Sequence, residues 1–156
     1  MTESDWKLPW EGGCRRGEVR LRVTKAPLLS FACHCSGCQK MSASAYSLTL
    51  TIPADGFEVI AGEPVIGGLH GPDAHHFHCP RCKIWMFTRV EGMDWLVNLR
   101  PSMLDEHGWV VPFFEVWTKE KLPWASTPAS RSYETVPEMH EWEGLMAAYA
   151  EEGARP

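Results

Sequence analysis

The sequence lacks several features that would assign it to a familiar class. Its 156 residues carry 15 basic and 20 acidic side chains, a net charge of −5, so the basic surface that binds a nucleic-acid backbone is missing. No apolar run approaches the roughly 18 residues of a membrane-spanning helix. Repeats, phosphate-binding glycine loops, a dinucleotide-binding fingerprint and a Ser–His–Asp arrangement are also absent. These absences favour a globular protein without nucleic-acid or membrane partners.

The length of the chain and its first residues predict a single domain whose thiols stay reduced. We expect a single domain over residues 1–156, because a chain of this size buries a core without covalent help. The opening residues are acidic where a secretory signal would be basic, and no apolar segment follows them. We therefore expect a cytoplasmic protein in which thiols stay reduced. The oligomeric state leaves no signature in the sequence.

Alternating hydrophobic and polar residues predict a mainly β domain of antiparallel strands. In residues 18–23 three aliphatic side chains alternate with two arginines, and residues 46–52 alternate hydrophobic side chains with Ser or Thr. Both patterns are typical of strands with one buried face. Further β-rich stretches, bounded by Gly, Pro or Asp, lie at residues 57–60, 85–90, 94–99 and 113–118.

One amphipathic helix is predicted near the end of the chain, at about residues 137–152. Pro137 suits its first turn and Gly153 ends it. We expect the hydrophobic side chains that recur at helical spacing to pack on the β domain. These are Met139, Trp142, Met146 and Tyr149.

Cysteines are the most strongly patterned residues, and they predict zinc binding. The chain has six, in tight groups: Cys14, Cys33, Cys35, Cys38, Cys79 and Cys82. In a reducing compartment such groups indicate metal binding or catalysis more often than disulfides. Zinc takes about four ligands in a tetrahedron with Zn–S near 2.3 Å, and a Cys-x-x-Cys turn presents two thiolates at a matching spacing. The chain has two such turns.

Spacing alone leaves two ways of sharing these ligands open. One four-thiolate structural site could use both Cys-x-x-Cys pairs and leave Cys14 and Cys33 unused. A split of three and three would instead place Cys33, Cys35 and Cys38 around one ion with a vacant fourth position. Catalytic zinc keeps such a position for water or substrate.

Three cysteine-containing stretches carry a resemblance to a known family. They are Gly-Gly-Cys at 12–14 before a Gly-Glu-Val-Arg strand, Cys-His-Cys-Ser-Gly-Cys-Gln-Lys at 33–40, and Phe-His-Cys-Pro-Arg-Cys at 77–82. Together they resemble the glutathione-dependent formaldehyde-activating enzyme family, which includes centromere-protein-V-like proteins and has the Mss4-like fold. Looser matches at 103–106 and 115–124 extend the resemblance over about residues 10–128, which we take as the core.

The resemblance implies a fold and an activity. The fold would consist of several small antiparallel sheets with zinc-binding cysteine knuckles, followed here by the C-terminal helix. The activity would be that of a carbon–sulfur lyase with two zincs, acting on a thiol–aldehyde adduct such as S-hydroxymethylglutathione, formed from glutathione and formaldehyde. Cys33, Cys35 and Cys38 match the catalytic zinc set. Cys14, Cys79 and Cys82 match three ligands of the structural zinc.

The sequence departs from the family at Arg16, where the fourth structural ligand would stand. A guanidinium has five donors and no lone pair for a metal. His76 or His78 could complete the site, water could do so, the metal could be absent, or Arg16 could hydrogen-bond the thiolates. Lys83 stands where the family usually has glycine. His34, between two cysteines, is expected to point away from their face toward solvent.

The chemistry is self-consistent, and one rival of another class remains. Zinc lowers the pKa of a bound thiol and polarises a carbonyl oxygen, and addition of a thiol to formaldehyde needs little else. The alternative is a zinc-stabilised β module that binds a protein or small ligand without catalysis, because a shared fold does not guarantee activity.

Overall fold

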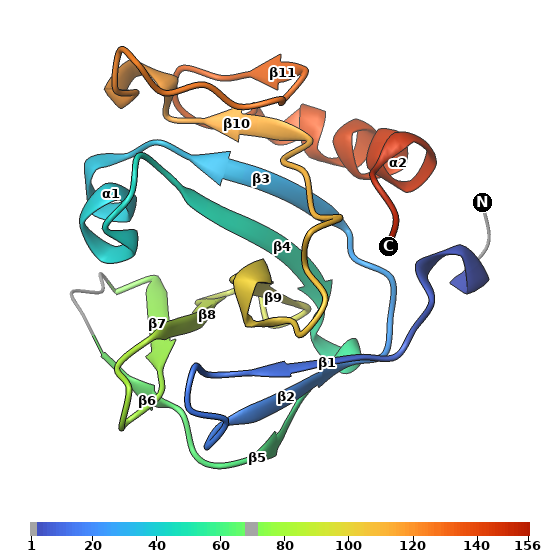
Figure 1. The fold of residues 1–156 in the computed structure, drawn as a ribbon. Coiled ribbons are helices and arrows are strands. Elements are labelled where there is room, and N and C mark those ends of the chain that lie inside the picture. The colour runs from blue at the N-terminus through green and yellow to red at the C-terminus, as the bar shows by residue number, and fades with distance from the viewer. Residues whose placement is uncertain (1–2, 68–71) are drawn as a thin grey trace.

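The computed structural model describes residues 3–67 and 72–156, whose strands form a small and a large sheet (Figure 1). The small sheet is antiparallel in the order β1-β2-β5, with β1 (Trp10–Gly13), β2 (Arg20–Val23) and β5 (Phe57–Ala61). The large sheet has the order β11-β10-β3-β4-β9-β8-β7-β6. Its strands are β3 (Leu29–Cys33), β4 (Ser47–Pro53), β6 (Val65–Ile66), β7 (Ala74–His78), β8 (Trp85–Val90), β9 (Leu96–Leu99), β10 (Phe114–Val116) and β11 (Arg131–Ser132).

Helices are short in the described part of the chain, as the prediction of a mainly β protein requires. The α-helices are α1 (Ser36–Ser42), which follows β3 directly, and α2 (Trp142–Glu152) near the C-terminus. Short 3-10 helices occupy Glu3–Trp6, Ala54–Gly56, Pro101–Met103, Thr118–Glu120 and Met139–Glu141. The predicted fold class is confirmed. Strand β10 is the exception to antiparallel pairing, since it runs parallel to both β3 and β11.

Strand β4 corrects one prediction from the sequence. Its alternation suggested one buried face, yet Ser47, Thr49 and Thr51 are as buried as Leu50. Side chains on both faces of β4 are thus covered, and its two edges pair with β3 and β9 inside the large sheet. The polar residues tolerate this burial where they find partners, and Thr51 donates to Asn98 Oδ1 at 2.8 Å.

The core divides into two hydrophobic clusters. One lies between the small sheet and strands β4, β8 and β9, and it includes Leu21, Ile52 and Met86. The other lies under α2, where Tyr149 and Leu145 pack with Phe114 of β10. In Figure 1 these appear as α2 against β3 and β10 on one side, and the small sheet against β8 and β9 on the other.

The C-terminal helix forms where predicted, and Trp142, Met146 and Tyr149 pack on the β domain as expected, with Met139 the exception. Its first predicted turn is a 3-10 helix, closed by a capping box between Glu138 and Glu141. Three residues per turn take Met139 out of phase with the α-helix, and its side chain is 84% exposed. The buried residues of α2 are Leu145 and Tyr149. The expectation that Met139 packs on the β domain is therefore wrong.

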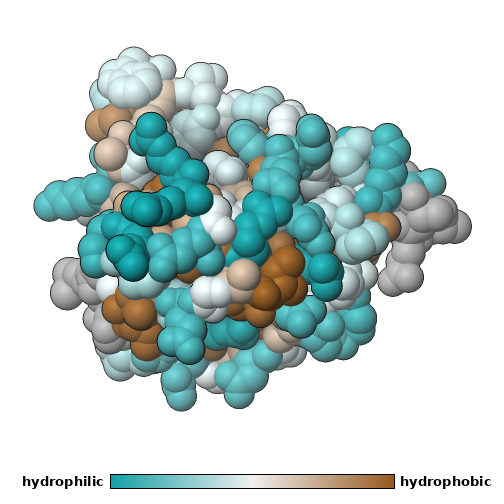
Figure 2. All heavy atoms as spheres, turned by 60° about the horizontal axis from the view of Figure 1, so that its bottom comes forward, coloured by the Kyte–Doolittle hydropathy of each residue, from teal (hydrophilic) through white to brown (hydrophobic). Residues whose placement is uncertain are grey.

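One face of the molecule is largely polar. Figure 2 brings the lower side of Figure 1 forward and shows mostly hydrophilic side chains, with the hydrophobic ones gathered in a few separate patches. Within residues 3–67 and 72–156 no helix has the length and apolar character needed to cross a membrane.

Candidate functional site

The fold gathers the six cysteines into two separate triads. Sulfur atoms of Cys33, Cys35 and Cys38 all lie within 4.8 Å of one another, and the same holds for Cys14, Cys79 and Cys82. We refer to these as the α1 cluster and the core cluster. The structure thus brings together three and three, and it does not pool the two Cys-x-x-Cys pairs into one site.

The α1 cluster is built by the passage from a strand to a helix. Cys33 ends β3, and Cys35 is the N-cap of α1 with an extended backbone. The Cys35 Sγ accepts a hydrogen bond from the Cys38 backbone N–H at 3.3 Å, as an N-cap side chain does. This cap turns the chain so that the first helical turn places Cys38 beside the other two sulfurs.

The core cluster is built from two turns between antiparallel strands. Cys14 lies in the β1–β2 turn, where its Sγ accepts from Val19 N–H at 3.4 Å. Cys79 and Cys82 lie in the β7–β8 turn, and Cys82 N–H donates to Cys79 Sγ at 3.5 Å. Cys79 is fully buried and Cys14 is 6% exposed. Both belong to the hydrophobic core under the small sheet.

Both triads have the chemistry of a metal site. In each, backbone N–H groups point at sulfur atoms, an arrangement that stabilises thiolates. Sulfurs around a tetrahedral zinc lie roughly 3.8 Å apart, which fits triads of this size. Thiolates are also the ligands that soft divalent metals prefer. The residues present therefore suit a metal ion with three sulfur ligands in either cluster.

Charge is unevenly shared within the α1 cluster. Hydrogen bonds from Cys33 and Cys38 lower the pKa of Cys35 to about 2, whereas hydrogen bonding to Cys35 raises the pKa of Cys33. One thiol therefore ionises first and the others keep their protons, because neighbouring negative charges repel. A shared cation removes that restriction, since metal binding releases the thiol protons.

Arg16 does not use its guanidinium at the core cluster. Its side chain is exposed, and its backbone N–H is the group that hydrogen-bonds Cys14. Burial raises the pKa of Cys14, but hydrogen bonds from Val19, Cys79, Arg16 and Cys82 outweigh it and lower the value to about 7.

Neither predicted histidine completes the core cluster. The His76 Nδ1 lies 2.8 Å from Thr88 Oγ1, and the His78 Nδ1 lies 3.3 Å from the His76 carbonyl oxygen. In the described part of the chain no histidine nitrogen joins the three sulfurs. The structure therefore leaves the fourth ligand position of this cluster without a protein side chain.

His34 overturns another expectation from the sequence. It was predicted to point toward solvent, yet its side chain is fully buried and its Nε2 lies 2.8 Å from Glu115 Oε2. The cause is tertiary. Strand β10 runs parallel beside β3, and this pairing brings the Glu115 carboxylate within reach of the His34 ring.

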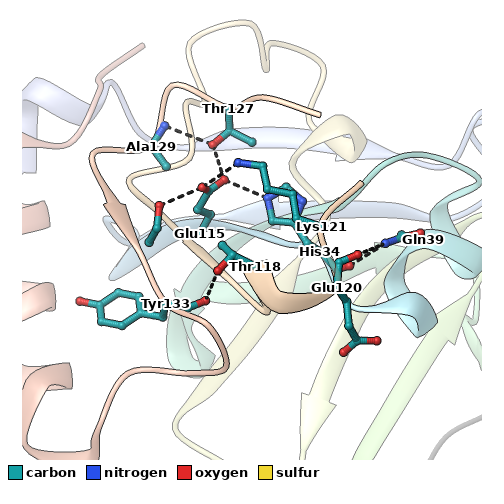
Figure 3. Close-up of polar contacts among 10 residues, drawn as sticks. His34, Gln39, Glu115, Thr118, Glu120, Lys121, Thr127, Ala129 and Tyr133 are labelled. Atoms are coloured by element: carbon teal, nitrogen blue, oxygen red, sulfur yellow. Dashed lines mark hydrogen bonds and ion pairs between the residues drawn. The ribbon is translucent and has the colours of Figure 1, made fainter. Parts of the chain in front are cut away.

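Glu115 is the centre of a polar network behind the α1 cluster (Figure 3). Its carboxylate accepts from Thr127 Oγ1 at 2.7 Å, Ser132 Oγ at 2.9 Å and Lys121 Nζ at 3.1 Å, besides its contact with His34. Burial raises the pKa of Glu115, but these hydrogen bonds together lower it to about 2. The carboxylate therefore stays ionised and anchors the His34 ring.

The same network reaches α1 through Gln39. Its Nε2 donates to the His34 carbonyl oxygen at 2.7 Å and to the Glu120 carbonyl oxygen at 3.1 Å (Figure 3). His34, between Cys33 and Cys35, is thus held at its ring by Glu115 and at its carbonyl oxygen by Gln39 of α1. Sequence reasoning missed this network, although one signal was present: Glu115 interrupts the apolar stretch of residues 109–117.

A large open cleft borders the α1 cluster. Its volume is about 1140 Å³, and it lies between residues 41–48, 83–85, 100–110 and 124–126. The cysteines themselves do not line it. Ser47 does, and it is the strand partner of Cys33; Ser42 also does, and its Oγ donates to the Cys38 carbonyl oxygen at 2.7 Å. Ser47 on the wall of the cleft is therefore the direct strand neighbour of Cys33 in the α1 cluster.

Arg100 connects the cleft with the cluster electrostatically. It lines the cleft and is only 8% exposed. Burial lowers the pKa of Arg100 to about 10, while the charges of Cys38 and Cys33 act in the opposite direction. A cationic group therefore stands between the thiols and the cleft.

Comparisons with known proteins agree with this arrangement. Residues 9–120 match the family model described as "Glutathione-dependent formaldehyde-activating enzyme". A Penicillium rubens protein named "Putative glutathione-dependent formaldehyde-activating enzyme" is 25% identical over 122 residues, covering 74% of this chain and 62% of that protein. A crystal structure of a Rhodobacter sphaeroides protein superposes with a TM-score of 0.51 at 19% identity, covering 61% of this chain and 87% of that one, which shows a shared fold.

Proposed function

Because this chain belongs to the glutathione-dependent formaldehyde-activating enzyme family, we propose that it is a zinc-dependent carbon–sulfur lyase. Its substrate is a thiol–aldehyde adduct such as S-hydroxymethylglutathione. In the synthetic direction a bond forms between the thiol sulfur and the aldehyde carbon, and the thiol proton moves to the aldehyde oxygen. In the reverse direction that bond breaks and the proton returns, so neither direction needs an oxidant or a reductant.

The α1 cluster beside the cleft is the observation that carries this proposal. Cys33, Cys35 and Cys38 supply three thiolates, one fewer than a closed zinc site uses. A zinc ion held by these three residues would lower the pKa of a substrate thiol and polarise a carbonyl oxygen. The adjacent cleft of about 1140 Å³ is large enough for a tripeptide thiol.

The chain's own residues hold this site in place. The N-cap contact of Cys35 with Cys38 sets the distance between two of the sulfurs. The contact between His34 Nε2 and Glu115 Oε2 fixes the residue between Cys33 and Cys35 from behind. We assign the core cluster a second, structural zinc, because Cys14 and Cys79 are buried in the hydrophobic core.

The experiment compares wild type with Cys35→Ala. Glutathione and formaldehyde are mixed with each protein, and S-hydroxymethylglutathione is followed by NMR. We expect wild type to accelerate adduct formation and Cys35→Ala to fall to the uncatalysed rate. Bound zinc should fall from two ions to one per chain. Circular dichroism shows that the variant is folded, and Glu151→Gln, on the exposed side of α2, serves as a control.

Two results would contradict the proposal. Equal rates in wild type and Cys35→Ala would remove the α1 cluster from catalysis. A zinc-loaded wild type that never exceeds the uncatalysed rate would favour the zinc-stabilised binding module instead.

A further inference from the structure

The cleft beside the α1 cluster is lined by basic residues and by no acidic ones. Lys83, Arg100 and His107 line it, whereas none of the chain's 20 Asp and Glu residues does. This contrasts with the net charge of −5 of the whole chain. A concave site with one sign of charge favours ligands of the opposite sign.

Arg100 is the most unusual of these residues because it is buried without a partner. Its guanidinium forms no hydrogen bond and no ion pair with any described residue, and its Nε is fully enclosed. Buried charged groups are normally paired, and leaving one without a partner is costly. An unpaired guanidinium on a cleft wall therefore has N–H donors available for a ligand that brings hydrogen-bond acceptors.

Trp85 holds this guanidinium in place. The Arg100 Cζ lies 4.0 Å from the centre of the Trp85 ring, and Trp85 is itself fixed by its Nε1 donating to Thr88 Oγ1 at 3.0 Å. Stacking uses the flat face of a guanidinium and leaves its N–H groups, which lie in the plane, free to donate. The pair of N–H groups at the guanidinium edge matches the two oxygens of a carboxylate.

Lys83 adds a second cation at the cost of backbone strain. Its φ of 61° lies in the left-handed region, where glycine is favoured. The side chain is exposed and lines the cleft. A residue kept in an unfavourable conformation at the edge of a cleft suggests that its side chain has a use there.

We propose that Arg100 is a specificity-determining residue that binds a carboxylate of the thiol substrate, with Lys83 as a second anion-binding residue. The inference rests on the proposed function for the identity of the thiol, since glutathione carries two carboxylates. Arg100 lies within the electrostatic reach of Cys33 and Cys38. A carboxylate held there places the rest of the thiol along the wall that leads to the α1 cluster.

The experiment measures the preference for a free carboxylate. Calorimetry gives the dissociation constants of zinc-loaded protein for glutathione and for glutathione diethyl ester, whose carboxylates are masked. A charge-assisted hydrogen-bonded pair changes affinity by about tenfold to a hundredfold, so wild type should prefer the free acid by that factor. We expect Arg100→Gln to reduce the preference to near one, and Arg100→Lys to restore part of it.

Arg89→Gln is the matched control for Arg100→Gln. Arg89 also lies over aromatic rings, 5.7 Å from the centres of Phe57 and Phe87, but it does not line the cleft. Its loss should leave the preference unchanged. Zinc content is measured for every variant, because an arginine that only balances the thiolate charge would alter zinc retention and affect both ligands equally.

Lys83→Gly provides a test that does not depend on a buried arginine. Relief of the left-handed backbone should raise the melting temperature by about 2 °C, while the preference for the free acid falls by about threefold. A variant that is more stable and less selective separates ligand binding from folding.

The outcomes are distinguishable from those of the lyase proposal. The inference fails if wild type binds acid and ester equally, or if Arg100→Gln keeps the wild-type preference. If no protein accelerates adduct formation but the preference is present in wild type and absent in Arg100→Gln, anion binding stands and the lyase function fails.

Discussion

The two cysteine triads use the same ligands in opposite surroundings. In the core cluster Cys14 and Cys79 are buried among hydrophobic side chains, and the described groups that hydrogen-bond its sulfurs from outside the triad are backbone amides such as Val19 N–H. The α1 cluster lies beside a cleft, next to a buried arginine and in front of the hydrogen-bonded contact between His34 and Glu115. Groups behind the ligands tune what a metal site does. The surroundings therefore favour a structural role for the first triad and a chemical one for the second.

The largest expected effect is on folding. Cys79→Ala should lower the free energy of unfolding by at least about 3 kcal/mol, because it removes a fully buried cysteine of the core cluster. In small domains the binding free energy of a structural zinc contributes directly to the stability of the fold. Cys35→Ala should cost only about 1 kcal/mol, the usual worth of a helix N-cap. Urea unfolding of both variants tests this contrast. Equal losses would mean that the two clusters do not differ in role.

A smaller effect is expected behind the α1 cluster, and it depends on pH. The folded pKa of Glu115 is about 2 against an ordinary value of 4.5, so its contribution is fully present above about pH 4.5 and is lost as the pH falls toward 2. Glu115→Gln should lower stability at neutral pH by about 3 kcal/mol and flatten the acid dependence between those values. Thermal melts from pH 7 to pH 2 measure both.

Glu58→Gln is the control for this experiment, because Glu58 is exposed on β5. It should leave the acid dependence as in wild type. A Glu115→Gln protein with an unchanged slope in that pH range would show that the network does not anchor the segment between Cys33 and Cys35.

The smallest effect is expected from supplying the missing ligand. Arg16→Cys should complete the core cluster, since the Arg16 backbone already hydrogen-bonds Cys14. We expect a gain of about 1 to 2 kcal/mol in stability and about tenfold slower zinc loss to EDTA, because a fourth thiolate closes the site. Arg15→Cys, one residue earlier, should give neither effect. If both variants behave alike, the position is not at the metal.

The sequence predicts a structure correctly where interactions between residues close in the chain determine it. The predicted strand at 85–90 matches β8 (Trp85–Val90), and the two Cys-x-x-Cys turns form as expected because both are short-range structures. The family resemblance also anticipated the division of the cysteines into two triads. Burial was predicted less well, since the side chains of β4 are buried on both faces although its sequence alternates.

Long-range packing produced what the sequence did not reveal. His34 is buried because β10 lies against β3, which joins residues 81 positions apart in the His34–Glu115 contact. Met139 is exposed because a 3-10 turn shifts the phase of the last helix. Arg100 attracted no notice in the sequence, because an arginine after a strand is ordinary until the structure shows it buried on a cleft wall.

The sequence by itself determined that this chain carries metal-site cysteines in a mainly β domain, because turn chemistry and residue alternation act over a few residues. Only the tertiary structure decided which cysteines meet, what stands behind them and which side chains line the cleft. Those properties depend on strand order, and strand order arises from pairing across the whole chain. The six thiols are therefore recognised from their spacing, while the difference between the two triads comes from the surroundings that the fold gives each of them.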